Sequence, residues 1–336
     1  MRVTFLLSLA FASLCNAQAS TAGIEALVLR RLPQHASSFS FSLLPTPSNA
    51  TANTTTPALD EYTISNSNNA TFDICGTSPI ALATGLRWYL TTYAHVDIYW
   101  FLGSRLHLAP HVLPPLNETY QGRAIVPWRY HFNTVTFSYT TAFWTWEDWE
   151  LELDWLALRG VNLPLAWVGY EKILTEVLLE AGFTAAEIAS FFSGPAFQSW
   201  NRFGNIQGSW GGDLPQHWIE AQFTLQKQIV ARMVELGMTP VLPAFTGFVP
   251  SQIGQHYPNA SFVNGSAWEA FPTAYTNVTF LEPFDPLFVS LQKSFIAKQK
   301  AAYGDVSSIY ALDQYNENNP YLGTGASPRV VRCVKI

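Results

Sequence analysis

The sequence has few cysteines and few charged residues. Three of its 336 residues are cysteine, 12% are Asp, Glu, Lys or Arg, and the formal net charge is −6. This cysteine count is too small to define a disulfide scaffold or a cysteine-based metal site. Because the chain also has no run of Lys and Arg, it lacks the positive surface by which proteins bind nucleic acid or anionic membranes. We therefore expect no nucleic-acid partner.

Metal-ligand motifs and membrane-spanning runs are missing as well. The histidines are scattered, and none of them forms an H-E-x-x-H motif or a comparable ligand spacing. A zinc-dependent mechanism therefore has no support in the sequence. No uninterrupted apolar run reaches the roughly 18 residues that a membrane-spanning helix needs, so we expect no membrane anchor.

Hydrophobic residues, by contrast, are abundant. They make up 48% of the chain, which is enough for a large core, and 15% of all residues are aromatic, including 12 Trp. Large aromatic side chains usually lie in the core, and we expect this of most of them. Flat apolar rings also suit stacking on sugars, so the composition is compatible with a carbohydrate ligand.

The N-terminus has the layout of a secretory signal peptide, which we assign to residues 1–19. Arg2 precedes an apolar run at 3–14, and Ala17 and Ala19 provide small residues at a cleavage site. We therefore predict a protein of the secretory pathway with an extracellular or vacuolar/lysosomal destination. The sequence leaves its oligomeric state open.

N-glycosylation sequons agree with this destination. Seven N-x-[ST] motifs occur, at Asn49, Asn53, Asn69, Asn117, Asn259, Asn264 and Asn277. Cys15 would be removed with the signal peptide. Cys75 and Cys333 are then the only possible disulfide pair.

The mature chain divides into two predicted units. Residues 20–125 are expected to form a small α/β domain, in which the run 80–93 has the apolar spacing of a helix. The segment 45–69 is rich in Thr, Asn, Ser and Pro, which is typical of an exposed loop between two strands.

In the second unit, residues 126–320, short β-type runs alternate with amphipathic helices, as in a parallel sheet of βα units. The expected strands are 134–139, 161–167, 239–245 and 309–315, and the expected helices are 147–159, 215–236 and 286–302. A long loop, 246–285, is expected to be functional. Four such units make the first half of a (β/α)₈ TIM barrel. Residues 321–336 form a divergent tail.

A TIM barrel carries its active site at the C-terminal ends of its strands. The fourth expected strand runs into Asn316 and Glu317. A carboxylic acid there can protonate a glycosidic oxygen, and the neighbouring Asn can hold a substrate hydroxyl. From placement alone, an acidic residue at a strand end is more often a helix cap or a solvated loop residue.

Four long motifs carry a resemblance to a known family. They are WTWEDWELELDWLALRGVNLPLAWVGYE (144–171), FFSGPAFQSWNRFGNIQGSWGGDLP (191–215), LGMTPVLPAFTGFVP (236–250) and IYALDQYNENNP (309–320). In this order they resemble the α-N-acetylglucosaminidases of glycoside hydrolase family 89. The resemblance implies a retaining exo-glycosidase that removes terminal α-linked N-acetylglucosamine (GlcNAc) from glycans. It also implies two catalytic Glu residues and no metal or organic cofactor.

The resemblance also assigns roles to individual residues. Glu317 matches the general acid/base of the family. The predicted substrate-binding residues are Asn133, Tyr139, Trp167, Gly169, Glu171 and Asn316. For Trp167, Gly169 and Glu171 the plain alternatives are a core aromatic, a turn glycine and a carboxylate at a helix N-terminus.

The chain departs from the family pattern in three places. Tyr170 stands where the family often has Gln, and Val135 stands where some members have Cys; both positions bear on the fine specificity. The tail 321–336 contains no Asp or Glu, and the second catalytic Glu, expected on a later strand, is absent from the sequence. Retaining hydrolysis needs a carboxylate nucleophile about 5 Å from the acid/base. On a regular strand, Asp313 would lie roughly 13 Å from Glu317, which is too far.

These features leave three readings of the function. The first is a retaining glycosidase lineage that is inactive in this truncated form. The second is a non-catalytic sugar-binding protein that keeps the pocket residues Asn133, Trp167 and Glu171. The third is a gene product whose residues after Pro320 are an artefact of splicing.

Overall fold

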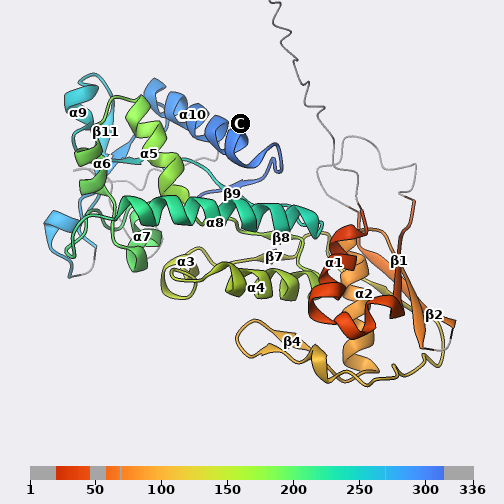
Figure 1. The fold of residues 1–336 in the computed structure, drawn as a ribbon. Helices are drawn as coiled ribbons and strands as arrows, with labels where there is room; N and C mark the ends of the chain where they lie inside the picture. Colours follow the sequence, from red (N-terminus) through yellow and green to blue (C-terminus); the bar gives the residue numbers. More distant parts are fainter. Residues whose placement is uncertain (1–19, 46–57, 69, 269, 314–336) are drawn as a thin grey trace, which may run out of the picture.

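A computed structural model describes residues 20–45, 58–68, 70–268 and 270–313 (Figure 1). The chain forms a small unit at its N-terminal end, coloured red to orange, and a larger unit that carries the remaining helices. None of the helices in the described ranges is long and apolar enough to cross a membrane.

The N-terminal unit is a four-stranded sheet covered by helices. The sheet order is β1-β3-β2-β6, in which β1 and β3 are parallel and the other pairs are antiparallel. The elements are α1 (Ala22–Arg31), β1 (Phe39–Leu43), β2 (Glu61–Asn68), β3 (Thr71–Gly76), α2 (Pro79–Thr92) and β6 (Tyr120–Arg123). Helix α2 confirms the predicted helix at 80–93, and the Ser78 side chain caps it by accepting from the Ala81 N–H at 3.0 Å.

One loop prediction in this unit is wrong in part. The segment 45–69 was expected to be a loop, but its end forms β2, since Tyr62 and Ile64 alternate with polar residues and face the buried side. Cys75 lies on β3 and forms no disulfide with another described residue, and its possible partner Cys333 lies outside the described residues.

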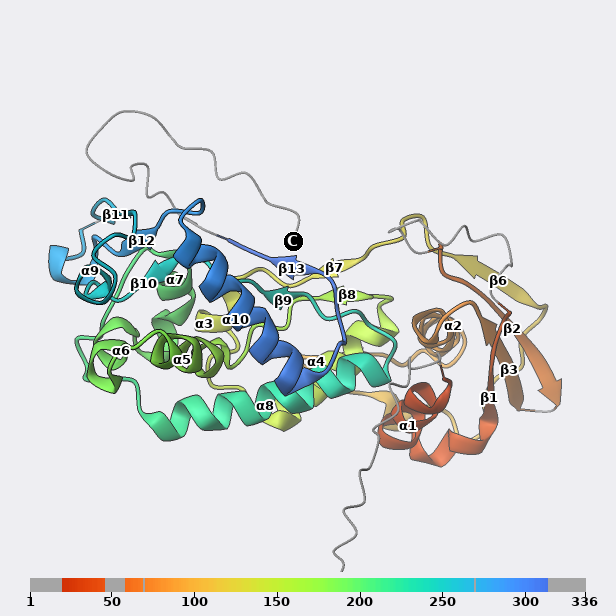
Figure 2. The same ribbon diagram turned by 90° about the horizontal axis from the view of Figure 1, so that it is seen from above.

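The larger unit is built around four short parallel strands. They are β7 (Tyr130–His131), β8 (Leu163–Pro164), β9 (Leu242–Pro243) and β13 (Tyr310–Ala311). β7 pairs with β8 and β9 with β13, while a parallel bridge from Leu165 to Val241 joins the two pairs. The strands therefore lie side by side in chain order, with all their C-terminal ends at one edge, and no closed barrel is present in the described residues (Figure 2).

Helices follow the strands and cover them from outside. They are α4 (Trp146–Leu158), α5 (Tyr170–Glu180), α6 (Ala185–Phe191), α7 (Gln198–Phe203), α8 (Gln216–Glu235) and α10 (Pro286–Tyr303). The predicted helices 147–159, 215–236 and 286–302 are confirmed as α4, α8 and α10. Their apolar stripes are buried, as expected from the spacing: Trp149, Leu153 and Leu156 of α4 are fully covered.

The first predicted strand, 134–139, is wrong. The strand is β7, which ends before that segment, and residues Thr136–Tyr139 form a short helix, α3. The Asn133 side chain turns the chain here by accepting from the Val135 N–H at 3.0 Å. Polar side chains that bond the nearby backbone compete with strand pairing. In this segment that bond outweighs the preference of the β-branched residues for a strand.

The other three strands are shorter than predicted. Pro164 stands in β8 and Pro243 in β9, and neither can donate a backbone hydrogen bond to a neighbouring strand, which favours short strands. The side chains of three buried glutamines on α8 and α10 form hydrogen bonds with the backbone at the strand ends. Gln226 donates to the Ala166 carbonyl at 2.5 Å, Gln299 donates to the Pro243 carbonyl at 2.7 Å, and Gln292 accepts from the Phe245 N–H at 3.0 Å.

The predicted loop 246–285 also contains secondary structure. It forms a small antiparallel sheet of order β10-β12-β11 with one short helix. These elements are β10 (Phe248–Val249), α9 (Ile253–His256), β11 (Phe262–Asn264) and β12 (Thr279–Leu281). Its apolar face packs with α5 and α6 in a second core cluster, which the proline, glycine and aromatic content of the segment does not reveal.

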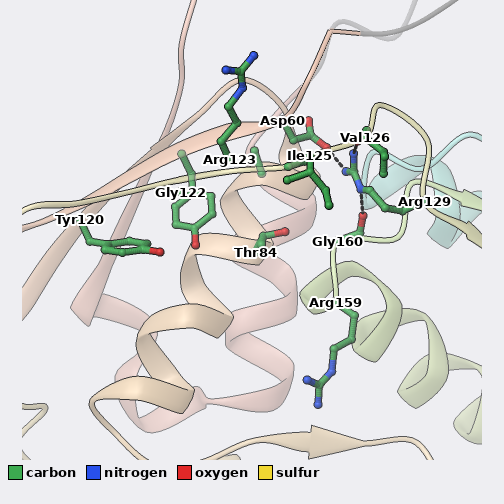
Figure 3. Close-up of a pocket in the computed structure, with 13 residues that line it drawn as sticks. Asp60, Thr84, Tyr120, Gly122, Arg123, Ile125, Val126, Arg129, Arg159 and Gly160 are labelled. Carbon is green, nitrogen blue, oxygen red and sulfur yellow. Dashed lines mark hydrogen bonds and ion pairs between the residues drawn. The ribbon is translucent and has the colours of Figure 1, made fainter.

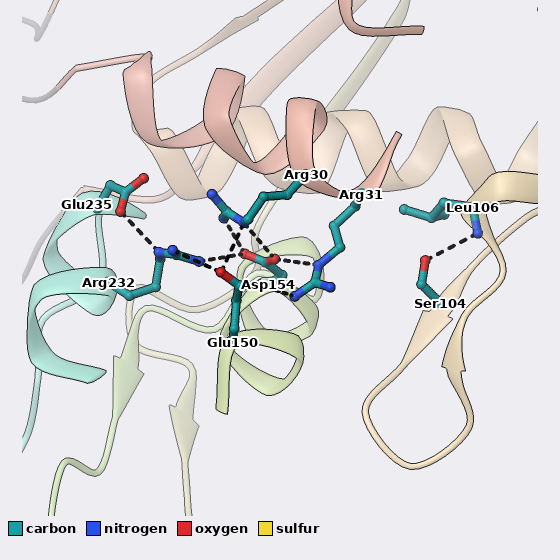
Figure 4. Close-up of polar contacts among 8 residues, drawn as sticks. All are labelled: Arg30, Arg31, Ser104, Leu106, Glu150, Asp154, Arg232 and Glu235. Carbon is teal, nitrogen blue, oxygen red and sulfur yellow. Dashed lines mark hydrogen bonds and ion pairs between the residues drawn. The ribbon is translucent and has the colours of Figure 1, made fainter. Parts of the chain in front are cut away.

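Ion pairs join the two units (Figure 4). Arg30 and Arg31 of α1 bond the carboxylate of Asp154 on α4, each with an N–O distance of 2.7 Å, and Asp154 is fully buried. Arg232 of α8 bonds Glu150 at 3.2 Å in the same cluster. Buried charges are retained where they are fully paired, so this cluster holds α1 against α4 and α8.

A second contact lies at the start of the larger unit (Figure 3). Arg129 forms an ion pair with Asp60 of the N-terminal unit and donates to the Gly160 carbonyl at 2.6 Å. It also donates to the carbonyls of Val126 and Pro127. One guanidinium thereby fixes the segment that leads into β7, the first strand of the sheet.

Candidate active site

A shallow hollow of about 370 Å³ lies between the C-terminal ends of the first and last parallel strands, and we call it the strand-end hollow. It is lined by Tyr130, Phe132, Asn133, Thr134, Ala311, Leu312 and Asp313. The Thr134 hydroxyl donates to the Asp313 carboxylate, so the loop after β7 and the loop after β13 are tied together across it. This is the edge at which parallel α/β folds place their ligands.

Two predicted residues lie on the loop that follows β7. Asn133 lines the strand-end hollow and is exposed. Tyr139, at the end of α3, is 62% exposed, and its ring lies 6.3 Å from the ring of Trp200 on α7. Helix α7 holds this loop in place, because the Ser199 hydroxyl donates to the Thr134 carbonyl at 3.1 Å and its N–H bonds Ser138 at 2.8 Å.

Trp167 and Gly169 follow β8 and are buried there. Trp167 is 1% exposed, its ring lies 6.3 Å from that of Phe203, and its indole N–H has no acceptor among the described residues. Gly169 has φ +69°, and a Cβ there would come within 2.8 Å of Phe223 Cα on α8. The glycine therefore serves both the left-handed turn and the close approach of α8.

Glu171 lies in a buried ion pair. Its two oxygens accept from Arg202 Nε and Nη2 at 2.8 and 2.9 Å, and the Arg202 guanidinium also lies 5.4 Å above the ring of Tyr170. Gln198, one turn before Arg202, has an amide nitrogen without a partner among the described residues, as does Arg202 Nη1. Glu171 is therefore buried beneath the loop that follows β8 and does not line the strand-end hollow.

The structure therefore brings Asn133 to the lining of the hollow, places Tyr139 on the following helix α3 against Trp200, and buries Trp167, Gly169 and Glu171 at the neighbouring strand end. Asn316 and Glu317 lie outside the described residues. No group of three or more His, Cys, Asp or Glu side chains with metal-site geometry occurs among residues 20–45, 58–68, 70–268 and 270–313.

Sequence reasoning missed Arg202 and Trp200. Both lie in the motif at 191–215, and their partners Glu171 and Tyr139 are 31 and 61 positions away in the chain. An arginine in an apolar segment was an available signal, because such a charge needs a buried partner.

Comparison with known families decides the lineage. Residues 129–332 match the family model of the α-N-acetylglucosaminidase TIM-barrel domain, and residues 22–115 match the model of the N-terminal domain of the same family. The first match alone covers more than half of the chain. The chain belongs to the α-N-acetylglucosaminidase family. By family it is therefore a glycoside hydrolase.

Individual relatives agree. The chain is 37% identical to human alpha-N-acetylglucosaminidase over 300 residues, which are 89% of this chain and 39% of the human protein. It is similar to a family 89 glycoside hydrolase from Clostridium perfringens in complex with 2-acetamido-1,2-dideoxynojirimycin, with a TM-score of 0.78 and 29% identity over 89% of this chain and 33% of that one.

A variant of the Clostridium enzyme, with two glutamates replaced by glutamine, was solved with its substrate GlcNAc-α-1,4-galactose. It matches with the same TM-score of 0.78 and 29% identity, again over 89% of this chain and 33% of that chain. The chain thus spans about two fifths of the human relative and a third of the bacterial one.

Proposed function

We propose that this chain carries the acid/base side and part of the sugar pocket of a retaining exo-glycosidase that removes terminal α-linked GlcNAc from glycans. In this proposal β7, β8, β9 and β13 are the first four strands of a (β/α)₈ barrel. The observation that carries it is the strand-end hollow, where the Thr134–Asp313 bond joins the ends of β7 and β13. The substrate of the Clostridium relative, GlcNAc-α-1,4-galactose, supports the choice of ligand.

Glu317 is the proposed general acid/base. It follows Asp313 by four residues in the sequence, and Asp313 lines the strand-end hollow. In the glycosylation step its carboxylic acid protonates the leaving oxygen, and in the second step its carboxylate activates water. Asn316, Asn133 and Tyr139 are proposed to hold hydroxyl or acetamido groups of the sugar, because amide and phenol groups donate and accept hydrogen bonds.

The nucleophile is a separate question. Of the carboxylates near the strand ends, Asp313 accepts from Thr134 and Glu171 has both oxygens bonded to Arg202. Glu171 does not line the strand-end hollow, and Asp313 precedes Glu317 by four residues, which on a regular strand separates them by roughly 13 Å and is too far for the carboxylate pair of a retaining enzyme. We therefore propose that the 336 residues by themselves bind α-GlcNAc without hydrolysing it. The alternative is a protein whose function is to bind sugar without catalysis, and for it we expect the same pocket residues. We also propose a secretory location, which rests on residues 1–19 and the sequons.

Binding of a GlcNAc-like inhibitor tests the proposal directly. The purified chain is titrated with 2-acetamido-1,2-dideoxynojirimycin, the ligand of the Clostridium relative, and the heat of binding is measured. We expect saturable binding that Asn133→Ala and Tyr139→Ala each weaken by about tenfold, as loss of one hydrogen bond to a ligand does. Asn68→Ala, at an exposed position of β2, is the matched control and should bind as the parent does. A parent chain that gives no saturable heat would refute the proposed pocket.

A further inference from the structure

A second hollow lies where the two units meet, and it shares no lining residue with the strand-end hollow. It has a volume of about 340 Å³, and we call it the junction hollow (Figure 3). Residues of β2, α2 and β6 line it from the N-terminal unit, and residues 124–126, Arg129 and the turn at 159–160 line it from the other side. Arg129 and Gly160 precede β7 and β8, so this hollow lies at the opposite ends of these strands from the strand-end hollow.

Tyr62 brings a buried hydroxyl to the junction hollow. Its side chain is 7% exposed, and its hydroxyl forms no hydrogen bond with another residue of the described ranges. Gly122 lies opposite Tyr62 in the register of β2 and β6, and a Cβ there would come within 2.5 Å of the Tyr62 hydroxyl oxygen. Because Gly122 has no side chain, the phenol end reaches the hollow. Buried polar groups normally have a hydrogen-bond partner, so this hydroxyl points to a ligand.

The Tyr62 hydroxyl is suited to donate to that ligand. Burial raises the pKa of Tyr62 to about 12, so the phenol keeps its proton at physiological pH. Thr84 of α2 offers the complementary group in the same hollow. Its hydroxyl donates to the Ile80 carbonyl at 2.8 Å, which leaves its oxygen lone pairs to accept from a ligand.

Tyr120 adds a fixed flat surface beside these hydroxyls. Its ring stacks on Trp88 of α2, with centroids 3.7 Å apart and 7° between the planes, and lies 6.2 Å from the ring of Tyr62. Ile125 and Val126 add apolar surface from the larger unit and are 93% and 44% exposed. A rigid ring next to apolar side chains suits the apolar face of a sugar ring.

The charged groups of the junction hollow favour an uncharged ligand. Each of its three arginines forms an ion pair with a carboxylate: Arg129 with Asp60, Arg123 with Glu61 at 3.0 Å and Arg159 with Asp97 at 2.8 Å. In Figure 3 the guanidinium groups of Arg123 and Arg159 point away from the space between Tyr120 and Thr84. An anionic ligand would therefore lose its hydration without gaining a free counter-charge.

We propose that the junction hollow binds a neutral polyhydroxylated ring, such as one uncharged sugar residue. An apolar face of the ring packs against Tyr120 and Ile125, the Tyr62 hydroxyl donates to a ligand oxygen, and a ligand hydroxyl donates to Thr84. The volume of about 340 Å³ is near the lower end for small-molecule sites, which suits one ring. This site is separate from the strand-end hollow, and the inference does not depend on the function proposed above.

Calorimetry of the full 336-residue chain tests the site with methyl β-D-glucopyranoside, an uncharged pyranose. The chain is first saturated with 2-acetamido-1,2-dideoxynojirimycin, which occupies the strand-end hollow in the proposed function. We expect saturable binding of the glucoside, with the same affinity in the presence and absence of the inhibitor. Methyl β-D-glucuronide, which carries a carboxylate on the same ring, should bind about fivefold more weakly or worse, because its charge finds no free partner.

Variants locate the bound ring. Tyr62→Phe removes only the hydroxyl and should weaken glucoside binding by about five- to tenfold, the scale of one hydrogen bond. The temperature of thermal unfolding should not fall, since this hydroxyl has no partner in the described fold. Tyr120→Ala removes the flat surface and should weaken binding by about tenfold. Tyr275→Phe removes a hydroxyl from a residue that lines neither hollow, and this matched control should bind as the parent does.

Three results would overturn the inference. The parent chain gives no saturable heat with the glucoside, the inhibitor competes with the glucoside, or Tyr62→Phe and Tyr120→Ala both bind it as the parent does. A loss of affinity in Tyr62→Phe together with a lower unfolding temperature would also count against it, because the hydroxyl would then support the fold. The inhibitor titration judges the strand-end hollow separately, and neither variant should change the affinity for the inhibitor.

Discussion

Glu171 and Arg202 form a two-bond ion pair beneath the end of β8, with N–O distances of 2.8 and 2.9 Å and both side chains buried. The pair joins the start of α5 to α7, the helix that also fixes the loop carrying Asn133 and Tyr139. We interpret it as a structural support for the loops that follow β7 and β8.

Removing one partner of this pair should destabilise the protein strongly. Arg202→Met leaves the Glu171 carboxylate buried without a counter-charge, which costs about 3–5 kcal/mol. Urea unfolding followed by tryptophan fluorescence measures the loss. Replacing both residues together, as Arg202→Met with Glu171→Leu, should recover most of it, because no unpaired charge then remains.

The matched control is an exposed ion pair. Lys298 bonds Glu180 at 2.6 Å, but the Glu180 side chain is 59% exposed, so Lys298→Met should cost at most about 1 kcal/mol. Equal losses for the two single variants would show that Arg202 is not a structural support.

Gly169 should tolerate no side chain. In Gly169→Ala the new Cβ meets the backbone of α8, 2.8 Å from Phe223 Cα and 2.9 Å from the Gln222 oxygen, in addition to the strain of a φ of +69°. We expect a loss of about 2–4 kcal/mol from overpacking and strain together. Gly103→Ala has φ +83° but no atom within 4 Å, so thermal unfolding should show only the strain, about 1–2 kcal/mol. A smaller loss at Gly169 than at Gly103 would contradict the described contact.

Because of Glu152, the free energy of unfolding should decrease as the pH rises. Burial raises the pKa of this carboxyl above its ordinary value of 4.5, and the bond from His131, at 3.1 Å, acts in the opposite direction. The folded state then binds the proton more tightly than the unfolded state. The stabilisation that Glu152 contributes is therefore present below pH 4.5 and is lost as the pH rises through the pKa of the folded state. Glu152→Gln should therefore gain stability relative to the parent from pH 4.5 upward.

Glu147 provides the control with the opposite sign. It is exposed at the N-terminal end of α4, and hydrogen bonds with its own backbone and Thr145 lower its pKa. Glu147→Gln should lose a little stability above pH 4.5. If the parent and Glu152→Gln had unfolding free energies with the same pH dependence, the raised pKa of Glu152 would be excluded.

Much of this architecture follows from local patterns. The helices α4, α8 and α10 were predictable because their apolar residues recur at helical spacing. The segment after β7 was mispredicted because β-branched and aromatic residues favour a strand, while one side-chain bond of Asn133 turns the backbone.

Such local patterns do not predict contacts between residues that are far apart in the sequence. The Glu171–Arg202 pair and the ring contact between Tyr139 and Trp200 depend on which loops meet at the strand ends. The role of Glu317 depends on resemblance to the family and stays a prediction, since no described contact involves it.

In a protein that also carries the later strands of the barrel, Glu317→Gln should lower hydrolysis of substrates with poor leaving groups by roughly 10²-fold or more, because the variant cannot protonate the departing oxygen. Activated aryl glycosides should be less affected in the first step. NMR of the initial product should show retention of the α-configuration. An inverted product would exclude the two-step mechanism.

We propose that these 336 residues bind terminal α-GlcNAc at the strand-end hollow but do not cleave it. Saturation-transfer NMR of the purified chain with GlcNAc-α-1,4-galactose, followed over a day, measures both properties in one sample. We predict saturation of the GlcNAc ring protons, its loss in Asn133→Ala, and no signal of free GlcNAc. Absence of saturation would contradict the proposed binding, and release of GlcNAc that Glu317→Gln abolishes would contradict the proposed lack of cleavage.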